Sequence, residues 1–332
     1  MKPSLRTLWA RLRNSRFAAV LVLLVVIWVY FSLSQDRFLT SANIQAMLAG
    51  ASILWFVALG LTFVMLAGAY DLSLGSQLAL SGMAFGAFYL SLGLPLLVAL
   101  GLTVAFGAVV GGGVNGFLVG RLGMPFLVVT LGTLTLYRGI VDLWSGGDTR
   151  QVESSALDAA AFDKLLGIPL TVWLMAAALA ISAYVLRSTY FGRDVYAVGG
   201  SAPAARLSGI RVARTLALVY AVAGAMAAVA GILQVARVGA VSPVVGGNVI
   251  FDATAAVVLG GASFTGGVGS VGGTGVAVIF LATLQNGLAV AGLQSAWQQV
   301  ISGGILIVAL FVDVMRNGGW HAFRHKMALR FR

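Results

Sequence analysis

Asp71 is an isolated carboxylate between two long apolar stretches, within the segment 68–76. An ionised side chain at the centre of a membrane costs about 2.5–3.5 kcal/mol, so it must be compensated, peripheral or functional. One interpretation is that Asp71 caps the N-terminus of the following helix and satisfies its free backbone amides. The other is that Asp71, with its neighbours Tyr70 and Ser73, forms a gate beside a solute pathway.

Amide side chains also stand within or near apolar stretches, at Asn115, Gln285 and Asn286. Such amides either form hydrogen bonds across helices or bind a polar solute. Asn115 and Asn286 therefore join the residues around Asp71 as candidates for a pathway or gate, with cross-helix bonding as the alternative.

Other polar residues at the ends of apolar stretches have structural interpretations. Arg138 and Asp142 are four residues apart and are expected to pair on one helix face. Asp252, four residues after Asn248, is expected to cap a helix N-terminus. Trp297 is expected to anchor the last span at the membrane interface.

Motifs for enzymatic chemistry are absent from the sequence. It contains no GxxxxGK followed by Ser or Thr, no HExxH and no GxSxG, so nucleotide hydrolysis by a P-loop and these hydrolase mechanisms are excluded. There are no cysteines, and His321 and His325 lie in a basic tail without a further metal ligand. We therefore expect no catalytic residues, no metal and no cofactor, and few charges along any pathway favour a small neutral solute.

A basic, polar island at 187–214 interrupts two apolar stretches. It carries five arginines against one acidic residue, Asp194, and loops this basic usually stay in the cytoplasm. Ser201 is a plausible N-cap, Pro203 fits the first helical turn and Gly209 fits a C′ stop. The pattern predicts a helix over 202–208 of roughly 10 Å, too short to cross a membrane but suited to docking a partner protein.

The composition requires a membrane. With 60% hydrophobic and 9% charged residues and a mean hydropathy of +0.98, the chain has more apolar surface than a soluble core could bury. The net charge of +11 is concentrated in segments that border apolar stretches, which argues against nucleic-acid binding. The acidic segment 142–168 is expected on the far, periplasmic side. The positive-inside rule then predicts cytoplasmic basic ends at 1–16 and 316–332 around one transmembrane domain at 17–315.

Hydrophobic stretches of sufficient length predict an all-α integral membrane protein of about ten transmembrane helices. The eighth is short and interrupted by glycine, as expected of a half-helix or re-entrant element. We expect a separate interfacial helix at 38–50, and a first span that is retained rather than cleaved as a signal peptide. The predicted spans are 17–34, 51–68, 73–92, 95–119, 126–143, 169–186, 215–236, 251–265, 272–292 and 296–315.

Four motifs together resemble the ribose-type permeases of bacterial ABC importers, which include relatives that import autoinducer-2. The motifs are FGRDVYAVGGSAPAARLSGI (191–210), RLGMPFLVVTLGTLTLYRGI (121–140), YDLSLGS (70–76) and AAVVLGGASFTGGVGSVGGTG (255–275).

The resemblance implies a permease subunit in the bacterial inner membrane that dimerises with the same or a second permease. It would bind ATPase subunits on the cytoplasmic face and receive a monosaccharide or similar polyol from a periplasmic binding protein. The helix at 202–208 would be the coupling helix. The residues that match the coupling motif are Gly192, Arg193, Gly199, Gly200, Ser201, Ala204, Ala205, Leu207, Gly209 and Ile210; Ser201 replaces the usual asparagine.

A different class of function remains open from the residues alone. A stand-alone secondary transporter or channel for a small polar solute would require a coupling-ion site or a selectivity filter. Carboxylates within the predicted spans are nearly lacking, which favours the importer. Neither the identity of the solute nor the composition of the dimer follows from the sequence.

Overall fold

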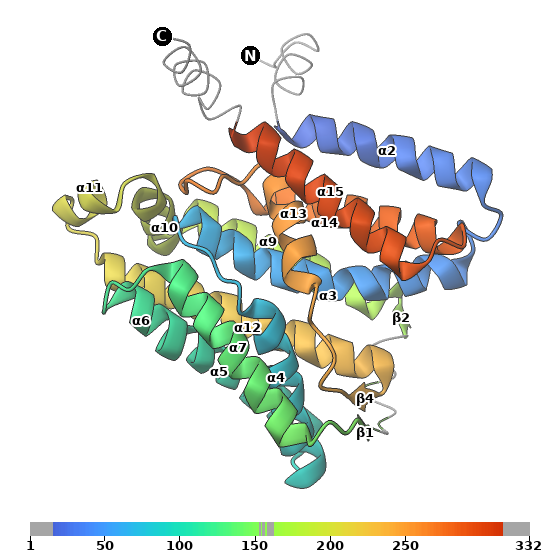
Figure 1. Cartoon of the computed structure of the whole chain (residues 1–332), viewed down its shortest axis with the longest axis horizontal. Coiled ribbons are helices and arrows are strands. Elements are labelled where there is room, and N and C mark those ends of the chain that lie inside the picture. Colours follow the sequence, from blue (N-terminus) through green and yellow to red (C-terminus); the bar gives the residue numbers. More distant parts are fainter. Residues whose placement is uncertain (1–15, 153, 155–156, 158–162, 315–332) are drawn as a thin grey trace, which may run out of the picture.

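A computed structural model describes residues 16–152, 154, 157 and 163–314. The basic segments predicted at 1–16 and 316–332, Arg16 excepted, lie outside these residues, as do His321 and His325. The described chain forms a bundle of helices, some of which run along the horizontal axis of Figure 1 and others obliquely to it. The main helices are α2 (Arg16–Ser34), α3 (Ser41–Leu66), α4 (Leu74–Gly86), α5 (Leu96–Val110), α6 (Gly116–Gly120), α7 (Phe126–Ser145), α9 (Leu170–Ser188), α12 (Val212–Val238), α13 (Val249–Leu259), α14 (Val271–Val290) and α15 (Ser295–Val314).

Each predicted span contains a helix, which confirms an all-α, multi-pass membrane protein. In the described part of the chain, 7 helices are long and apolar enough to cross a membrane, and 19–34 and 249–259 form shorter apolar helices. The eighth span is indeed short, because α13 ends at Leu259 and a glycine-rich loop follows. Two π-helical turns, η1 (Ala87–Ser91) and η2 (Gly111–Asn115), continue α4 and α5 within their spans.

The separate interfacial helix predicted at 38–50 is wrong. Residues 41–66 form one continuous helix, α3, whose N-terminus is capped by the Thr40 hydroxyl accepting from the Asn43 backbone N–H at 3.4 Å. The segment 38–50 lacks a proline, and its one glycine, Gly50, does not break the helix. The first turns of α3 are amphipathic and the rest of the helix is apolar, and this change of pattern led to the prediction of two separate helices.

Two short helices form the basic island at one end of the bundle. These are α10 (Tyr190–Gly200) and α11 (Ala202–Leu207). In Figure 1 the start of α2 and the end of α15 are the ends of these two helices that lie nearer to α11.

Small antiparallel strand pairs at the opposite end were not predicted from the sequence. Strand β1 (Arg150–Gln151) pairs with β4 (Ala240–Val241), and β2 (Lys164–Leu165) pairs with β3 (Ile168–Pro169). The first pair fastens the acidic segment 142–168 to the chain that leaves α12. Pairs of two residues have no hydrophobic pattern that would reveal them.

The core is centred on α3 and α12. In the apolar 18-residue stretch of α3, 89% of the residues are buried. Helix α12 packs most extensively against α3, α5 and α4. Glycines allow the closest of these contacts: a Cβ built on Gly107 of α5 would lie 2.5 Å from the Gly224 carbonyl oxygen and 2.6 Å from the Ala228 Cβ of α12. Helices in a membrane associate through such close packing, because lipid is as apolar as the side chains and the hydrophobic effect does not drive their association.

This packing predicts different outcomes for two substitutions on α5. Gly107→Val would force α5 and α12 apart and should lower the free energy of unfolding by about 1–3 kcal/mol. Gly101→Val is the control, because nothing lies within 4 Å of its Cβ position. The melting temperatures of the purified variants in one detergent measure the effect. Equal melting temperatures would contradict the close contact between α5 and α12.

Candidate functional site

The α3–α4 break places Asp71 in a fully buried polar cluster. Its Oδ1 accepts the Ser73 backbone N–H at 2.8 Å and the Ser73 hydroxyl at 2.6 Å. The Asn115 side-chain amide, from η2, donates to Asp71 Oδ2 at 3.2 Å and to Ser73 Oγ at 2.8 Å. All three side chains are buried. The structure thus brings together three of the predicted pathway residues.

Two tyrosines form further hydrogen bonds next to this cluster. The Tyr70 hydroxyl forms a hydrogen bond with Thr254 Oγ1 of α13, and the Tyr220 hydroxyl of α12 donates to the Tyr70 carbonyl oxygen at 3.0 Å. Four segments that are distant in sequence therefore meet at 70–73. Because an unpaired polar group in an apolar interior is costly, these bonds stabilise the non-helical break between α3 and α4.

The fifth predicted pathway residue, Asn286, lies elsewhere. Its side-chain amide and that of Asn43 exchange two hydrogen bonds of 2.9 Å between α14 and α3. Asn286 also lines a cavity of about 270 Å³ together with Arg237 and Gln298. It is therefore both a cross-helix partner and a residue accessible from a cavity.

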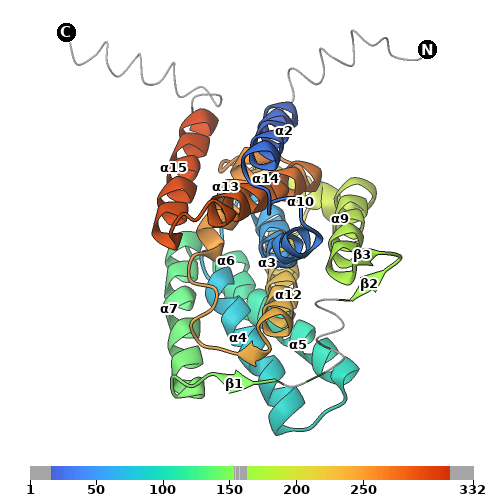
Figure 2. The same cartoon turned by 90° about the vertical axis from the view of Figure 1, so that its right-hand side faces the viewer.

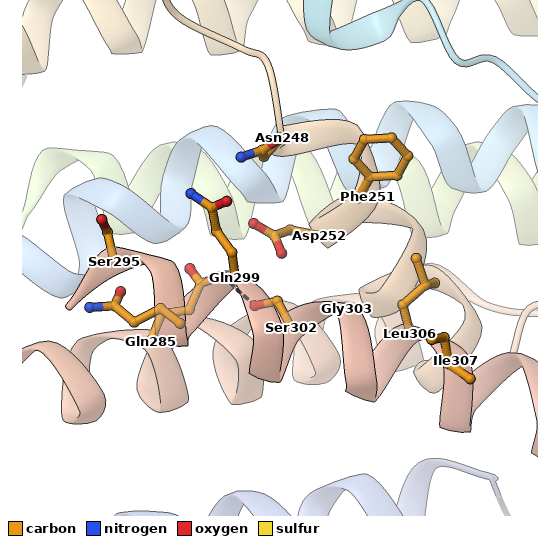
Figure 3. Close-up of a pocket in the computed structure, with 11 residues that line it drawn as sticks. Asn248, Phe251, Asp252, Gln285, Ser295, Gln299, Ser302, Gly303, Leu306 and Ile307 are labelled. Carbon is orange, nitrogen blue, oxygen red and sulfur yellow. Dashed lines mark hydrogen bonds between the residues drawn. The ribbon is translucent and has the colours of Figure 1, made fainter. Parts of the chain in front are cut away.

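A larger groove of about 580 Å³, with both polar and apolar side chains in its lining, opens between α13, α14 and α15. In Figure 3 the side chains of Asn248, Asp252 and Gln299 point toward the same space. The Gln285 amide donates to Ser302 Oγ at 3.2 Å, and both residues lie within interaction range of the Asp252 carboxylate. Apolar groups complete the wall: Phe251, Leu306 and Ile307.

The two cavities share Gln285 and Gln298 as lining residues, so polar groups continue from the groove toward Asn286. Neutral amides, two hydroxyls and one carboxylate in the groove, with Arg237 in the adjoining cavity, present both donors and acceptors with little net charge. This combination suits a small solute that has several hydroxyl groups.

The N-cap role expected for Asp252 is wrong. The N-cap residue of α13 is Asn248, which makes no side-chain capping bond, and Asp252 lies in the first turn. Its carboxylate instead faces the groove. The available signal was the polar set Asn248, Asp252, Gln285, Gln298 and Gln299 at the ends of three apolar stretches, but only the fold shows that these ends meet.

The pair expected between Arg138 and Asp142 is replaced by longer-range contacts. The Arg138 guanidinium donates to the Pro243 carbonyl at 2.5 Å and to the Val245 carbonyl at 3.0 Å. Arg138 therefore holds the segment that leads from β4 to the groove residue Asn248. A sequence spacing of four residues could not indicate these acceptors.

The basic island folds as predicted around its cap. The Ser201 hydroxyl accepts from the Ala204 backbone N–H at 3.3 Å, and Gly209 adopts a φ of +85° after α11. The helix spans 202–207, one residue shorter than predicted, with Ser208 as the C-cap. At its tip the Leu207 side chain is 92% exposed, so an apolar group projects from a basic surface.

The residues expected to couple to a partner fall into two groups. Arg193, Gly200, Ser201, Ala204, Leu207 and Gly209 are exposed, and Ile210 is half-buried. Gly192, Gly199 and Ala205 are buried and lack an outward face. The exposed group is available to a partner, whereas the buried group positions the two helices.

Gly199 is the closest contact between the island and the bundle. A Cβ on Gly199 would overlap the Leu66 carbonyl oxygen at the end of α3 and would lie 2.5 Å from the Gly267 nitrogen. The same Leu66 carbonyl accepts the Gly267 N–H at 3.0 Å, and Gly266 packs against Gly68. We name this contact of 66–68, Gly199 and 266–267 the glycine joint.

Comparison with known proteins gives a consistent result. Residues 43–310 match the family model described as "Branched-chain amino acid transport system / permease component". The chain is 36% identical to the ribose import permease protein of Escherichia coli strain K12 over 299 residues, covering 89% of this chain and 92% of the relative.

Two further relatives carry other substrate names. The chain is 32% identical to the xylose transport system permease protein of Haemophilus influenzae over 362 residues, covering 90% of this chain and 96% of the relative. It is 35% identical to the autoinducer 2 import system permease protein of Klebsiella pneumoniae over 320 residues, covering 96% and 92%. No solved structure matches the chain.

The buried cluster predicts a large effect of Asp71→Ala on stability. The substitution would leave the Ser73 N–H and the Asn115 amide without their acceptor, at about 1–3 kcal/mol for each buried group. We expect a markedly lower melting temperature in detergent, and a smaller loss for Asp71→Asn, which keeps one side-chain oxygen. Asp148→Ala, at an exposed aspartate, is the control. A melting temperature of Asp71→Ala equal to that of the control would refute a stabilising role of the cluster.

Proposed function

The chain belongs to the family of permease components of the branched-chain amino acid transport system type, and from this premise we propose that it is the membrane subunit of an ABC importer. It would carry a small, neutral, polyhydroxylated solute such as a monosaccharide across the bacterial inner membrane. Separate ATPase subunits would supply the energy, and a periplasmic binding protein would deliver the solute. The observation that carries the proposal is the short capped helix α11, with an apolar tip on a basic surface, in a chain of this family.

The proposed orientation rests on charge. Arg187, Arg193, Arg206, Arg211 and Arg214 gather at the α11 end of the bundle, and such loops are usually cytoplasmic. In Figure 1 the start of α2 and the end of α15 are the ends of these helices nearer to α11, and the flanking segments 1–16 and 316–332 are basic, so we propose that both termini are cytoplasmic as well.

The solute class is supported by the chemistry of the groove at α13–α15. Amides and hydroxyls pair with the vicinal hydroxyls of a sugar, and an apolar residue such as Phe251 covers its C–H face. An amino acid zwitterion would require a cation for its carboxylate, and among the described residues that line this groove there is no lysine or arginine. The ribose, xylose and autoinducer-2 names of the relatives agree with a hydroxylated solute.

A branched-chain amino acid is the second candidate, because the family description names this class. The apolar wall of Phe251, Leu306 and Ile307 favours it, as does Arg237 in the adjoining cavity. A direct comparison of labelled ribose, xylose and leucine in one uptake assay distinguishes the two classes.

A second permease subunit would complete the pathway. Only 11% of the residues in the apolar 18-residue stretch of α15 are buried, and 28% of those in α7. Both helices lie on the same face of the molecule (Figures 1 and 2), beside the open groove. A partner subunit against this face would enclose the groove; whether it is a copy of this chain or a different permease is an outcome of co-purification with two tags.

Docking of the ATPase predicts that Leu207→Glu weakens the complex. Burying a charge in an apolar contact is unfavourable, and we expect at least about a tenfold lower affinity, equivalent to ~1.4 kcal/mol. Leu166→Glu is the matched control, because Leu166 is 85% exposed in the hairpin β2–β3 at the other end of the bundle. Co-purification with the tagged ATPase subunit at graded concentrations measures the change.

An unchanged ATPase affinity for Leu207→Glu, or an equal loss for Leu166→Glu, would contradict the docking of α11. Solute uptake by the purified chain without any ATPase subunit would instead support the stand-alone transporter.

A groove that contacts the solute predicts that Asp252→Asn combined with Gln285→Leu lowers sugar uptake. Loss of two or three hydrogen bonds should reduce the rate about tenfold or more at a limiting solute concentration. The measurement is labelled sugar uptake in proteoliposomes with the ATPase and binding protein. Gln234→Leu, at a half-buried glutamine outside both cavities, is the control. Wild-type uptake by the double variant would remove the groove from the pathway.

A further inference from the structure

A third cavity of about 450 Å³ lies on the outer surface of the bundle, between η2–α6 and the start of α12. Three of its lining residues are arginines: Arg121, Arg211 and Arg214. The remaining walls come from small or apolar residues such as Gly113, Phe117 and Ala217. Among the cavities of the described residues, this one combines an apolar floor with a purely basic rim, and the transport function proposed above makes no use of it.

Helix packing brings the arginines together. A Cβ on Gly120, the last residue of α6, would lie 2.7 Å from the Ala213 carbonyl oxygen of α12. Arg121 directly follows α6, Arg211 is the N-cap residue of α12 and Arg214 lies in its first turn, so the three share the rim of one groove. All three side chains are exposed, and no carboxylate within the described ranges forms an ion pair with them.

Such an arrangement requires a counter-charge. Like charges held close together repel, and each arginine has five N–H donors suited to a phosphate. Orientation in the membrane requires only that arginines lie on the cytoplasmic side; it does not require that they surround a cavity.

The floor of the groove is shaped for an apolar chain. Gly112 and Gly116 pack directly against Ala221 and Ala217 of α12, which seals the helix contact. Gly113, in contrast, has only Val109, at 3.9 Å, near its Cβ position, and therefore leaves open space at the outer surface of the span. Phe117 stands exposed beside this space.

We propose that this groove binds an anionic phospholipid. Arg121, Arg211 and Arg214 hold the headgroup phosphate, and an acyl chain lies along Gly113 and Phe117 toward the membrane interior. Basic pockets between helices at a membrane edge bind such headgroups, and neighbouring arginines each add attraction to an anionic lipid. The lipid is favoured over free phosphate because the floor is apolar, and over an acidic protein surface because Gly113 and Phe117 are exposed on a helix apolar enough to cross a membrane.

The bound lipid would stabilise the connection between the basic island and the rest of the bundle. Arg211 lies one residue after Ile210, which closes α11, and one residue before α12 begins. A headgroup that bridges Arg211 and Arg121 would fasten the end of the basic island to α6.

The test is native mass spectrometry of the full-length purified protein with phosphatidylglycerol or phosphatidylcholine added in equal amounts. We expect phosphatidylglycerol to bind at least about tenfold better than phosphatidylcholine, and this preference to disappear in Arg121→Gln/Arg211→Gln/Arg214→Gln. The control with equal charge loss is Arg37→Gln/Arg150→Gln/Arg187→Gln, at exposed arginines outside the groove. This control should retain the preference.

A second variant tests the apolar floor. Gly113→Leu fills the groove without a close contact to the backbone of α12, and it keeps all charges. It should lower phosphatidylglycerol binding several-fold, and millimolar inorganic phosphate should compete poorly with the lipid.

Three results would overturn the proposal. Equal lipid binding by the groove variant and the wild type, or equal loss in both triple variants, would show that the groove is not a specific site. Full competition by inorganic phosphate with no effect of Gly113→Leu would indicate a simple anion site. Loss of ATPase binding with retained phosphatidylglycerol would assign the arginines to a protein partner instead.

Discussion

The glycine joint is the contact on which the rest of the structure depends. The Leu66 carbonyl accepts the Gly267 N–H and lies against Gly199, where a Cβ would overlap it. Three segments that are far apart in sequence thus touch through backbone atoms alone: the end of α3, the end of α10 and the loop between α13 and α14. Side chains would separate them by several ångströms, so glycine is required at this place by space rather than by flexibility. In an apolar environment the carbonyl also needs its donor, since no water replaces it.

This joint connects features that would otherwise be independent. Asp71 follows Leu66 by five residues and lies within the non-helical break that its bonds with Ser73 and Asn115 stabilise. Helix α11 follows Gly199 by three residues, and α13, which carries Asp252, leads into the loop that contains Gly267. A displacement of the basic island would therefore displace both the helix break at 67–73 and the α13 wall of the groove, because these parts are in direct backbone contact at the glycine joint. Close-packed backbone transmits displacement because it has few alternative arrangements.

The sequence predicted what depends on local pattern. Long apolar stretches gave the positions of the helices, and Ser201, Pro203 and Gly209 gave the short helix nearly to the residue, because capping uses neighbours in the chain. Contacts between distant segments were not accessible. Arg138 was assigned to Asp142, the partner at helical spacing, whereas its acceptors are carbonyl groups more than 100 residues away. Asp252 was assigned to a helix cap because only its neighbours in the sequence were considered. The two-residue strands β1 and β4 are too short to carry a hydrophobic pattern.

The π-helical turn η2 has a consequence for the whole fourth span. It makes a 25-residue apolar helix out of α5 and α6, but with one residue more than an α-helix would use for the same rise. Each residue rotates an α-helix by about 100°. Gly107 before the turn and Gly116 after it both face α12, while Asn115 inside it faces Asp71. The π-helical turn therefore acts as a phase shift. If the same sequence continued as a regular α-helix through 111–115, every residue after the turn would be rotated by about 100°, and Arg121 would turn away from Arg211 and Arg214.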